Sequence, residues 1–174
     1  MDFCRQSLLA GLVAVLCGTM ASPSAPASIP PEYSDYEKLV LNNVARFHAT
    51  FNAHEFAKNG EMVADNIHVN SNGVELNGRA AFVERIARFI QPFPDVQIHD
   101  VVTIVNGNKA AVRYVITGTQ DGDLETPEGV IRATHKHVDV DGAEFFTLDE
   151  NAKVVDLVTI ERLDQLFQQL QSSP

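Results

Sequence analysis

A change in hydrophobic period near Pro94 constrains the fold of this chain more than any other feature of its sequence. Before this point the apolar residues recur every three to four positions, and after it they alternate with polar residues. The first pattern is typical of amphipathic helices, and the second is typical of strands with one buried face. Helices followed by a run of strands predict an α+β domain.

The first half is expected to hold helices and one hairpin. Helical spacing runs from Asp35 to about Asn59, with a break near His54 before a second short helical segment. Residues 65–78 predict a strand, a turn at Asn72-Gly73 and a short return strand. Residues 78–93 predict another amphipathic helix, because Phe82, Ile86, Phe89 and Ile90 share one side and the prolines at 92 and 94 end it.

The second half is expected to form antiparallel strands joined by tight turns. The expected elements are strands at 95–107 and 108–120, a loop at 121–129, a long strand from Gly129, the turn "DENAK" at 149–153, a strand at 154–163 and a closing helix at 163–171. Helices packed on one face of a strongly curved antiparallel sheet leave a concave apolar pocket at its open end.

The N-terminus resembles a secretory signal peptide. An apolar run from Leu8 to Cys17 follows Arg5, and small residues stand at Thr19 and Ala21. This pattern predicts cleavage after Ala21, so the mature chain is expected to be secreted or to stay in the lumen of the secretory pathway. An anchor that is never cut is the alternative, although the run is short for spanning a bilayer.

Composition limits what the mature chain can do. Residues 22–34, rich in Pro, Ser and Ala, predict a flexible lead-in, which leaves one domain at 35–171. Both cysteines lie in residues 1–21, so the mature domain has no disulfide and no thiol nucleophile. The net charge of −10 argues against nucleic acid or an anionic membrane as a partner of the mature form.

One carboxylate stands in an apolar strand pattern. Glu144 in "AEFFTL" shares a strand face with Phe146 and Leu148. Burial on an apolar pocket wall disfavours the charged form of a carboxyl and raises its pKa, which suits it to proton transfer. The alternative is that Glu144 points to water at a sheet edge, or pairs with Arg113 or Arg132.

Three further polar residues could join Glu144. Asp156 also alternates with apolar residues, so it is either a second pocket carboxylate or a solvated one near the hairpin end. His68 and Asn70 share one strand face, opposite Ile67 and Val69. Two interpretations of His68 and Asn70 stay open: either both side chains line the pocket, or both face outward.

A possible metal motif lies in "THKHVD". His135, His137 and Asp139 alternate, and imidazole and carboxylate are ordinary metal ligands. Histidines at this spacing are also common on exposed strand faces, and we expect no metal site here. A bulge at Asp141-Gly142 would decide whether these residues share the face of Glu144.

Four stretches that together cover nearly all of residues 35–170 resemble one known family. They are "RFHATFNAHEF" (46–56), "NGRAAFVERIARFIQPFPDVQIHDVV" (77–102), "NKAAVRYVITGTQDGDL" (108–124) and "GAEFFTLDENAKVVDLVTIERLDQLFQQL" (142–170). In this order they resemble the SnoaL-like polyketide cyclase family. Its members share the cone-shaped α+β fold of nuclear transport factor two and of ketosteroid isomerase.

The resemblance implies a small enzyme that needs neither a metal nor a cofactor. The best-known members close a ring in a polyketide by intramolecular aldol condensation, with a pocket carboxylate as general acid and base. That carboxylate matches Glu144, although the family usually has Asp there. The family's histidine after Gly-Thr is Gln120 here, and its Glu-His-Trp-Asp in the last strand is replaced from Asp156 onward. Proteins of this fold often dimerise, so a homodimer is expected by analogy.

The resemblance and the strand pattern lead to one functional expectation. The chain is expected to be an acid/base enzyme, of the lyase or isomerase class, that cyclises, isomerises or dehydrates a small apolar carbonyl compound. Catalytic roles are expected for Glu144, with Asp156 and His68 as helpers. Contacts to substrate are expected from Asn70, His48 or its neighbour Phe47, Phe51, Arg113 and Phe146. The alternatives are a non-catalytic carrier of a hydrophobic ligand, or a hydrolase on the same scaffold.

Overall fold

The computed structural model describes residues 32–171 of the chain, so the predicted signal peptide lies outside the described residues. The helices and strands in chain order are α1 (Asp35–Asn52), α2 (Phe56–Glu61), β1 (Val63–Ser71), β2 (Val74–Asn77), α3 (Arg79–Phe89), β3 (Gln97–Asn106), β4 (Lys109–Thr119), β5 (Leu124–Thr126), β6 (Gly129–Ile131), β7 (His137–Leu148), β8 (Val154–Glu161) and α4 (Leu163–Gln171). The predicted α+β class is confirmed. Within residues 32–171 no helix has the length and apolar character needed to span a membrane.

Helix α1 begins and ends where its sequence indicates. The hydroxyl of Ser34 accepts a hydrogen bond from the backbone N–H of Glu37, and the Glu37 carboxylate accepts one from the N–H of Ser34. This reciprocal pair satisfies N–H groups that have no partner inside the helix. After Asn52 the chain turns, and His54 takes a left-handed φ of 56°, so the predicted break is confirmed.

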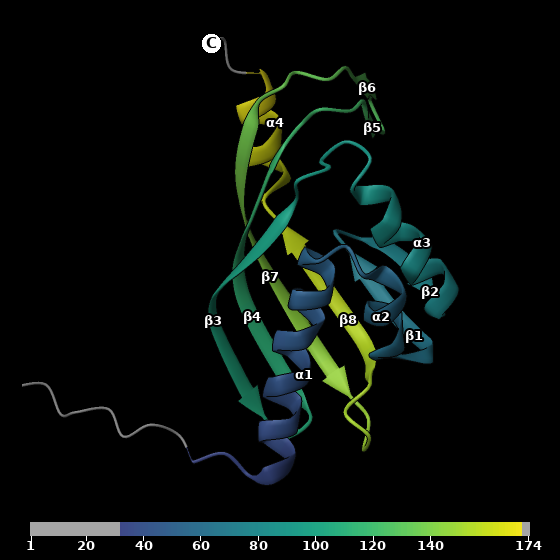
Figure 1. Ribbon diagram of the computed structural model, residues 1–174, viewed down its shortest axis with the longest axis vertical. Helices are drawn as coiled ribbons and strands as arrows, with labels where there is room; N and C mark the ends of the chain where they lie inside the picture. Colours follow the sequence, from purple (N-terminus) through teal and green to yellow (C-terminus); the bar gives the residue numbers. More distant parts are fainter. Residues whose placement is uncertain (1–31, 172–174) are drawn as a thin grey trace, which may run out of the picture. The chain divides into compact units, whose positions relative to one another are not determined.

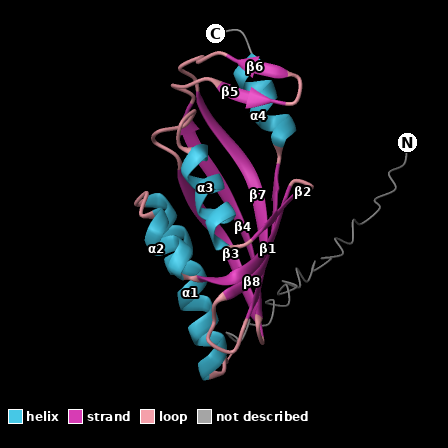
Figure 2. Cartoon of the chain, turned by 90° about the vertical axis from the view of Figure 1, so that its right-hand side faces the viewer, coloured by secondary structure: helices cyan, strands magenta, loops and turns pink. Residues whose placement is uncertain are grey.

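Six strands form the main sheet, in the order β2-β1-β8-β7-β4-β3. Figure 1 shows this curved sheet with α1 lying across one face, and Figure 2 shows α2 and α3 on the same side. The neighbours pair antiparallel except β1 and β8, which pair parallel with Val69 opposite Leu157. The antiparallel pairing predicted for the second half of the chain is confirmed, and the parallel pair joins β8 to β1 from the first half. No tight turn joins β1 to β8, so nothing local sets their relative direction.

The segment between β4 and β7 differs from its prediction. The long strand begins at His137 rather than Gly129, and β5 and β6 form a separate small hairpin within the expected loop and strand start. Gln120, which is fully buried, organises this segment. Its amide donates hydrogen bonds to the carbonyls of Ile131 and Arg132, and its Oε1 accepts from the hydroxyl of Thr134 at 2.7 Å.

Strand β7 pairs with β4 in unbroken register from Thr147 opposite Lys109 to His137 opposite Thr119. Because no bulge interrupts β7 here, its even-numbered residues all face inward. Glu144 therefore shares the buried face with Phe146 and Leu148, as the alternation predicts.

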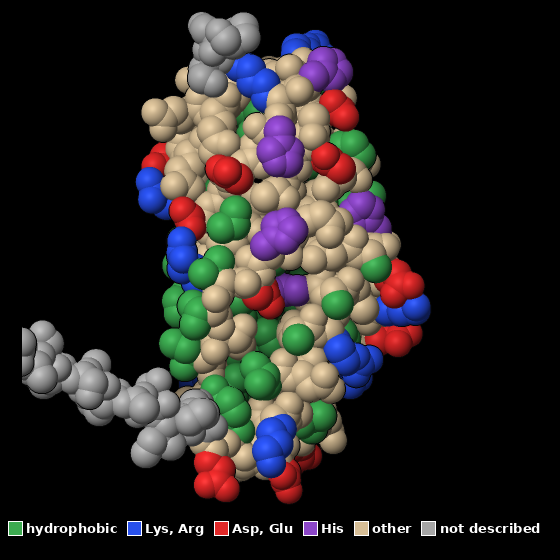
Figure 3. Space-filling view, turned by 60° about the vertical axis from the view of Figure 1, so that its left-hand side comes forward, with side chains coloured by type: hydrophobic (Ala, Val, Ile, Leu, Met, Phe, Trp, Pro, Cys, Tyr) green, Lys and Arg blue, Asp and Glu red, His purple; other side chains and the backbone are tan. Residues whose placement is uncertain are grey.

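The outer face of the sheet is partly apolar. Val102 and Ile104 on β3, Phe145 on β7 and Ile160 on β8 are all exposed. The register places Phe145 beside Ala111, which pairs with Ile104, so the apolar residues run across neighbouring strands. Figure 3 shows exposed apolar side chains on the side of the molecule that carries β3.

Candidate active site

A cavity of about 400 Å³ lies between the helices and the inner face of the sheet. Its walls are mostly aliphatic and aromatic, as in many sites for small molecules. Six of the apolar lining residues are Phe47, Phe51, Phe82, Ile116, Val140 and Leu157. The polar lining residues include Asn59, Asn72, Tyr114, Glu144, Thr159 and Glu161.

Glu144 presents its carboxylate to this cavity from the middle of β7. It is 6% exposed, and its Oε2 accepts a hydrogen bond from Nε2 of His48 at 2.7 Å. Among residues 32–171, no hydrogen bond reaches its second oxygen, Oε1. One oxygen of Glu144 is thus fixed, and the other can meet a ligand.

His48 connects Glu144 to a second carboxylate. The imidazole, on the buried stripe of α1, is 3% exposed, and its Nδ1 lies 2.6 Å from Oδ1 of Asp100. Burial alone would lower the pKa of His48, but hydrogen bonds to Asp100 and Glu144 and the charges of both raise it to about 10. The ring is therefore a cation at neutral pH and donates to both carboxylates.

Asp100 lies on the edge strand β3, next to a break in the β3–β4 register between Asp100 and Val102. Its side chain is 32% exposed, whereas that of Glu144 is 8% exposed. The charged imidazole of His48 thus lies between a carboxylate in the cavity and one that touches solvent.

A second acidic group lines the cavity near Glu144. The hydroxyl of Tyr114 donates a hydrogen bond to Oε1 of Glu161 at 3.3 Å. Burial, and then the charge of Glu144, raise the pKa of Glu161, and burial together with both carboxylates raises the pKa of Tyr114. Hydrogen bonds with Tyr114 and Asn72 lower the pKa of Glu161, but burial and the charge of Glu144 outweigh them, so both groups are held toward their neutral forms.

Asn59 adds a polar atom with no protein partner. Its side-chain amide donates to the carbonyl of Phe47 at 2.7 Å, while its buried Oδ1 has no hydrogen-bond partner among the described residues. Such atoms are rare in folded proteins. Since Asn59 lines the cavity, a hydroxyl of a bound molecule could satisfy this oxygen.

The predicted site residues divide between two faces of the sheet. Glu144 and Phe51 line the cavity, and His48 lies directly behind Glu144. Phe146 is buried one layer deeper, where its ring packs edge-on against Phe47 at 5.5 Å between centroids.

Four other predicted residues lie outside the cavity. His68 donates toward Asp156 at 2.8 Å and toward Glu75 at 2.6 Å, and Asn70 also donates to Glu75. Strand alternation turns this group to the outer face, opposite the buried Ile67 and Val69. The same alternation turns Arg113 outward, where it pairs with Asp141 at 2.7 Å.

The histidines of the possible metal motif are also separated from Glu144. His137 and Asp139 face outward on β7. His135 precedes the strand, has a left-handed φ of 57° and pairs with Asp121 at 2.9 Å. Within the described residues, no group of three or more His, Cys, Asp or Glu side chains is arranged to hold a metal ion.

Sequence reasoning missed several polar groups of the site, among them Asp100, Tyr114 and Glu161. Tyr114 and Glu161 have the same sequence pattern as Glu144, because each lies two residues from a buried residue on the same face of its strand. Asp100 had no comparable signal, because its neighbours on β3 are mostly exposed.

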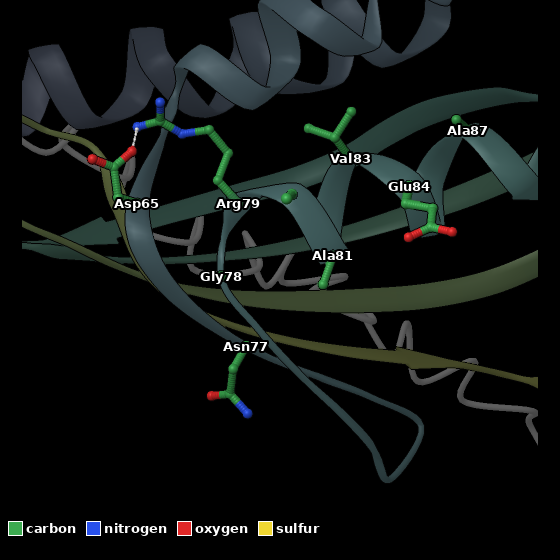
Figure 4. A pocket seen from close by; sticks show the side chains of 9 residues that line it. Asp65, Asn77, Gly78, Arg79, Ala81, Val83, Glu84 and Ala87 are labelled. Carbon is green, nitrogen blue, oxygen red and sulfur yellow. Dashed lines mark ion pairs between the residues drawn. The ribbon is translucent and has the colours of Figure 1, made fainter.

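A second depression lies on the surface at the start of α3 (Figure 4). Alanines 80, 81 and 87 form much of its wall, and its cation, Arg79, pairs with Asp65 at 2.6 Å. This depression is more open than the cavity around Glu144, and its cation already pairs with Asp65, so the cavity around Glu144 is the better candidate site.

Comparison with known proteins agrees with this fold. Residues 44–157 match the family model of the SnoaL-like domain. A candidate SnoaL-like polyketide cyclase from Jannaschia sp. CCS1 superposes with a TM-score of 0.71 at 17% identity, covering 83% of this chain and 99% of the other. A search of curated proteins found no match.

Two further solved structures are similar at the same level. A candidate polyketide cyclase from Xanthomonas campestris pv. campestris gives a TM-score of 0.70 at 20% identity, covering 78% of this chain and 99% of the other. AclR, a candidate hydroxylase from Streptomyces galilaeus, gives 0.69 at 18% identity, covering 79% and 99%. At these identities the superpositions establish a shared fold.

Proposed function

Because the chain belongs to the SnoaL-like domain family, we propose that it is an enzyme that moves a proton at a carbon atom beside the carbonyl group of a small apolar compound. The observation that carries this proposal is the position of Glu144. Its Oε2 is held by His48 at 2.7 Å, and its Oε1 is left for a ligand in an apolar cavity. A fixed carboxylate in such a cavity can act as a general base and then as a general acid.

The reaction begins when Oε1 of Glu144 takes a proton from the carbon. The electrons of the C–H bond then form a carbon–carbon double bond, and the π electrons of the carbonyl group move onto its oxygen. If the resulting enolate attacks a second carbonyl in the same molecule, a carbon–carbon bond closes a ring. The attacked oxygen then takes the proton from Glu144. If the proton instead returns to another carbon, the product is an isomer. Both outcomes return Glu144 to its starting state.

His48 acts as a positioning residue in this scheme. Its cation fixes the direction of the Glu144 carboxylate, and Asp100 fixes the imidazole from the other side at 2.6 Å. A carboxylate is a weak base, so it is best matched to a carbon whose proton is already acidic. Carbons between two carbonyl groups have this property, which favours substrates resembling polyketides.

The test uses 2-tetralone, an apolar ketone with exchangeable protons beside its carbonyl. We expect the protein to accelerate exchange of these protons with D₂O, followed by proton NMR, and Glu144→Gln to slow the catalysed exchange about 100-fold or more. Glu75→Gln is the matched control, because Glu75 also accepts a hydrogen bond from a histidine, at 2.6 Å, but lies outside the cavity.

Exchange by Glu144→Gln at the wild-type rate would contradict the assignment of the base. Binding of 2-tetralone without accelerated exchange would favour the alternative of a ligand carrier. The mature enzyme is further proposed to act after export, and the N-terminal residue of the exported protein tests this: Ser22 is expected if cleavage follows Ala21.

A further inference from the structure

Three residues lie in one row across the inner face of the sheet. Tyr114 on β4 pairs with Gly142 on β7, and Gly142 pairs with Glu161 on β8. The ring of Tyr114 extends over Gly142 toward Glu161. A Cβ added at Gly142 would lie 2.7 Å from the hydroxyl oxygen of Tyr114 and closer still to its Cζ and Cε2. The missing side chain of Gly142 is therefore what lets Tyr114 reach Glu161.

Asn72 fixes the far end of this row. It lies in the β1–β2 turn with a left-handed φ of 48°, and its side-chain amide donates to Oε2 of Glu161. Its Oδ1 accepts from the backbone N–H of Glu161 at 3.1 Å. Because Oε1 of Glu161 meets the hydroxyl of Tyr114, both carboxyl oxygens have defined partners.

The two carboxyl groups of the cavity have opposite surroundings. Glu144 faces the cationic imidazole of His48, whereas no ion pair joins Glu161 to a cation among the described residues. Burial and the nearby Glu144 raise the pKa of Glu161. An acid held toward its neutral form can serve as a hydrogen-bond donor beside a second carboxylate that acts as the base.

We propose that Tyr114, backed by Glu161, binds the carbonyl oxygen of the substrate whose C–H group faces Glu144. This inference rests on the proposed function and adds the group that stabilises the enolate. In the structure the hydroxyl of Tyr114 donates to Oε1 of Glu161. When Glu161 is protonated and a substrate is bound, this hydrogen bond reverses: Oε1 of Glu161 donates to the oxygen of Tyr114, and the hydroxyl of Tyr114 donates to the substrate oxygen. The hydroxyl proton stays on Tyr114 while Glu144 removes the carbon proton, so no further proton acceptor is needed.

The spacing of the two groups suits this arrangement. Gly142 and Glu144 are two residues apart on one strand face, which separates their rows by on the order of 7 Å. An H–C–C=O unit with one hydrogen bond at its oxygen and Glu144 at its hydrogen spans a similar length. The inference thus specifies the substrate as an apolar molecule with an enolisable ketone or ester carbonyl.

The test measures binding of 2-naphthol, an aromatic alcohol that resembles an enol. It is made in the Glu144→Gln protein, since glutamine imitates the protonated Glu144 that is present with the enolate. We expect 2-naphthol to bind there, and Tyr114→Phe in the same background to weaken binding about tenfold, as for loss of one hydrogen bond in a buried site. Tyr33→Phe is the matched control and should leave the affinity unchanged.

A second readout separates this role from a structural one. The absorption spectrum of bound 2-naphthol should shift toward that of its anion when Tyr114 is present, and should shift less in Tyr114→Phe and in Glu161→Leu. Circular dichroism melts identify any variant that loses its fold, and Glu161→Gln, which keeps a donor to Tyr114, should retain most of the affinity.

Equal affinity in the proteins with and without Tyr114→Phe would overturn the inference, and so would a failure of 2-naphthol to bind the Glu144→Gln protein. Because this assay contains no Glu144, it is independent of the 2-tetralone exchange test. If Tyr114→Phe does not weaken 2-naphthol binding while the wild-type protein still accelerates 2-tetralone exchange, Glu144 remains the base and only the proposed oxygen-binding role of Tyr114 is rejected.

Discussion

Nε2 of His48 lies 2.7 Å from Oε2 of Glu144, and this contact joins the first helix of the domain to the middle of its longest strand. His68 repeats the arrangement on the outer face, where it contacts Glu75 at 2.6 Å. The two histidines differ in burial, since the side chain of His48 is 4% exposed and that of His68 is 46% exposed. Water screens the outer pair, so only the buried pair is expected to have a large effect on the protein.

The buried pair predicts how stability depends on pH. The pKa of His48 is raised from 6.5 to about 10 in the folded protein, so the folded state holds a proton that the unfolded state releases above pH 6.5. The stabilisation from His48 is complete below pH 6.5 and is lost as pH rises toward 10, by up to about 1.4 kcal/mol per pH unit. Urea unfolding between pH 6 and pH 10 measures this slope.

Two histidine variants serve as the comparison for that slope. His48→Gln should remove most of the fall in unfolding free energy across this range, whereas the exposed His68→Gln should leave it nearly unchanged. An unaltered slope in His48→Gln would mean that other groups cause the pH dependence.

Gly142→Ala should destabilise the protein. The added methyl group would overlap the ring of Tyr114, and such overpacking costs about 1–3 kcal/mol. The measurement is the urea midpoint, with Gly118→Ala as a milder control, because a Cβ at Gly118 would meet its neighbours at 3.4 Å. A destabilisation no larger than that of Gly118→Ala would show that Tyr114 moves aside without cost. Binding of 2-naphthol should also weaken in Gly142→Ala.

Two matched aspartate variants compare the carboxylate partner of the buried His48 with that of the exposed His68. Asp100→Asn weakens the hold on His48, and we expect it to reduce 2-tetralone exchange about tenfold, the usual effect of a hydrogen bond to a charged group. Asp156→Asn makes the same change at His68 and should leave exchange unchanged. A loss in Asp156→Asn equal to that in Asp100→Asn would restore Asp156 to the catalytic group.

The outer face of the sheet is proposed to bind a second copy of the chain. Ile104, Phe145 and Ile160 are each about half exposed or more, and soluble monomers seldom expose apolar patches of this kind. We expect a homodimer in sedimentation analysis and a monomer for Phe145→Lys. Leu39→Lys, at an exposed apolar position on α1, is the control and should remain dimeric. A monomeric wild-type protein would contradict this proposal.

Local pattern determined most of the fold. The change from a helical period to strand alternation identified the helices and the strands of the main sheet, because a buried face imposes its period on the sequence. The same alternation placed Glu144 on the inner face with Phe146. It could equally have placed Tyr114 and Glu161 there, since their strands alternate in the same way.

Tertiary structure alone decided which polar groups meet. His48 and Glu144 are 96 residues apart, and His48 and Asp100 are 52 apart, so no local spacing relates them. The parallel pairing of β1 with β8 likewise brings together distant parts of the chain. Periodicity specifies the face on which a side chain lies, but its neighbours on that face depend on how helices and strands pack. The sequence therefore determined that a carboxylate enters the cavity, and packing alone gave it a charged histidine as its partner.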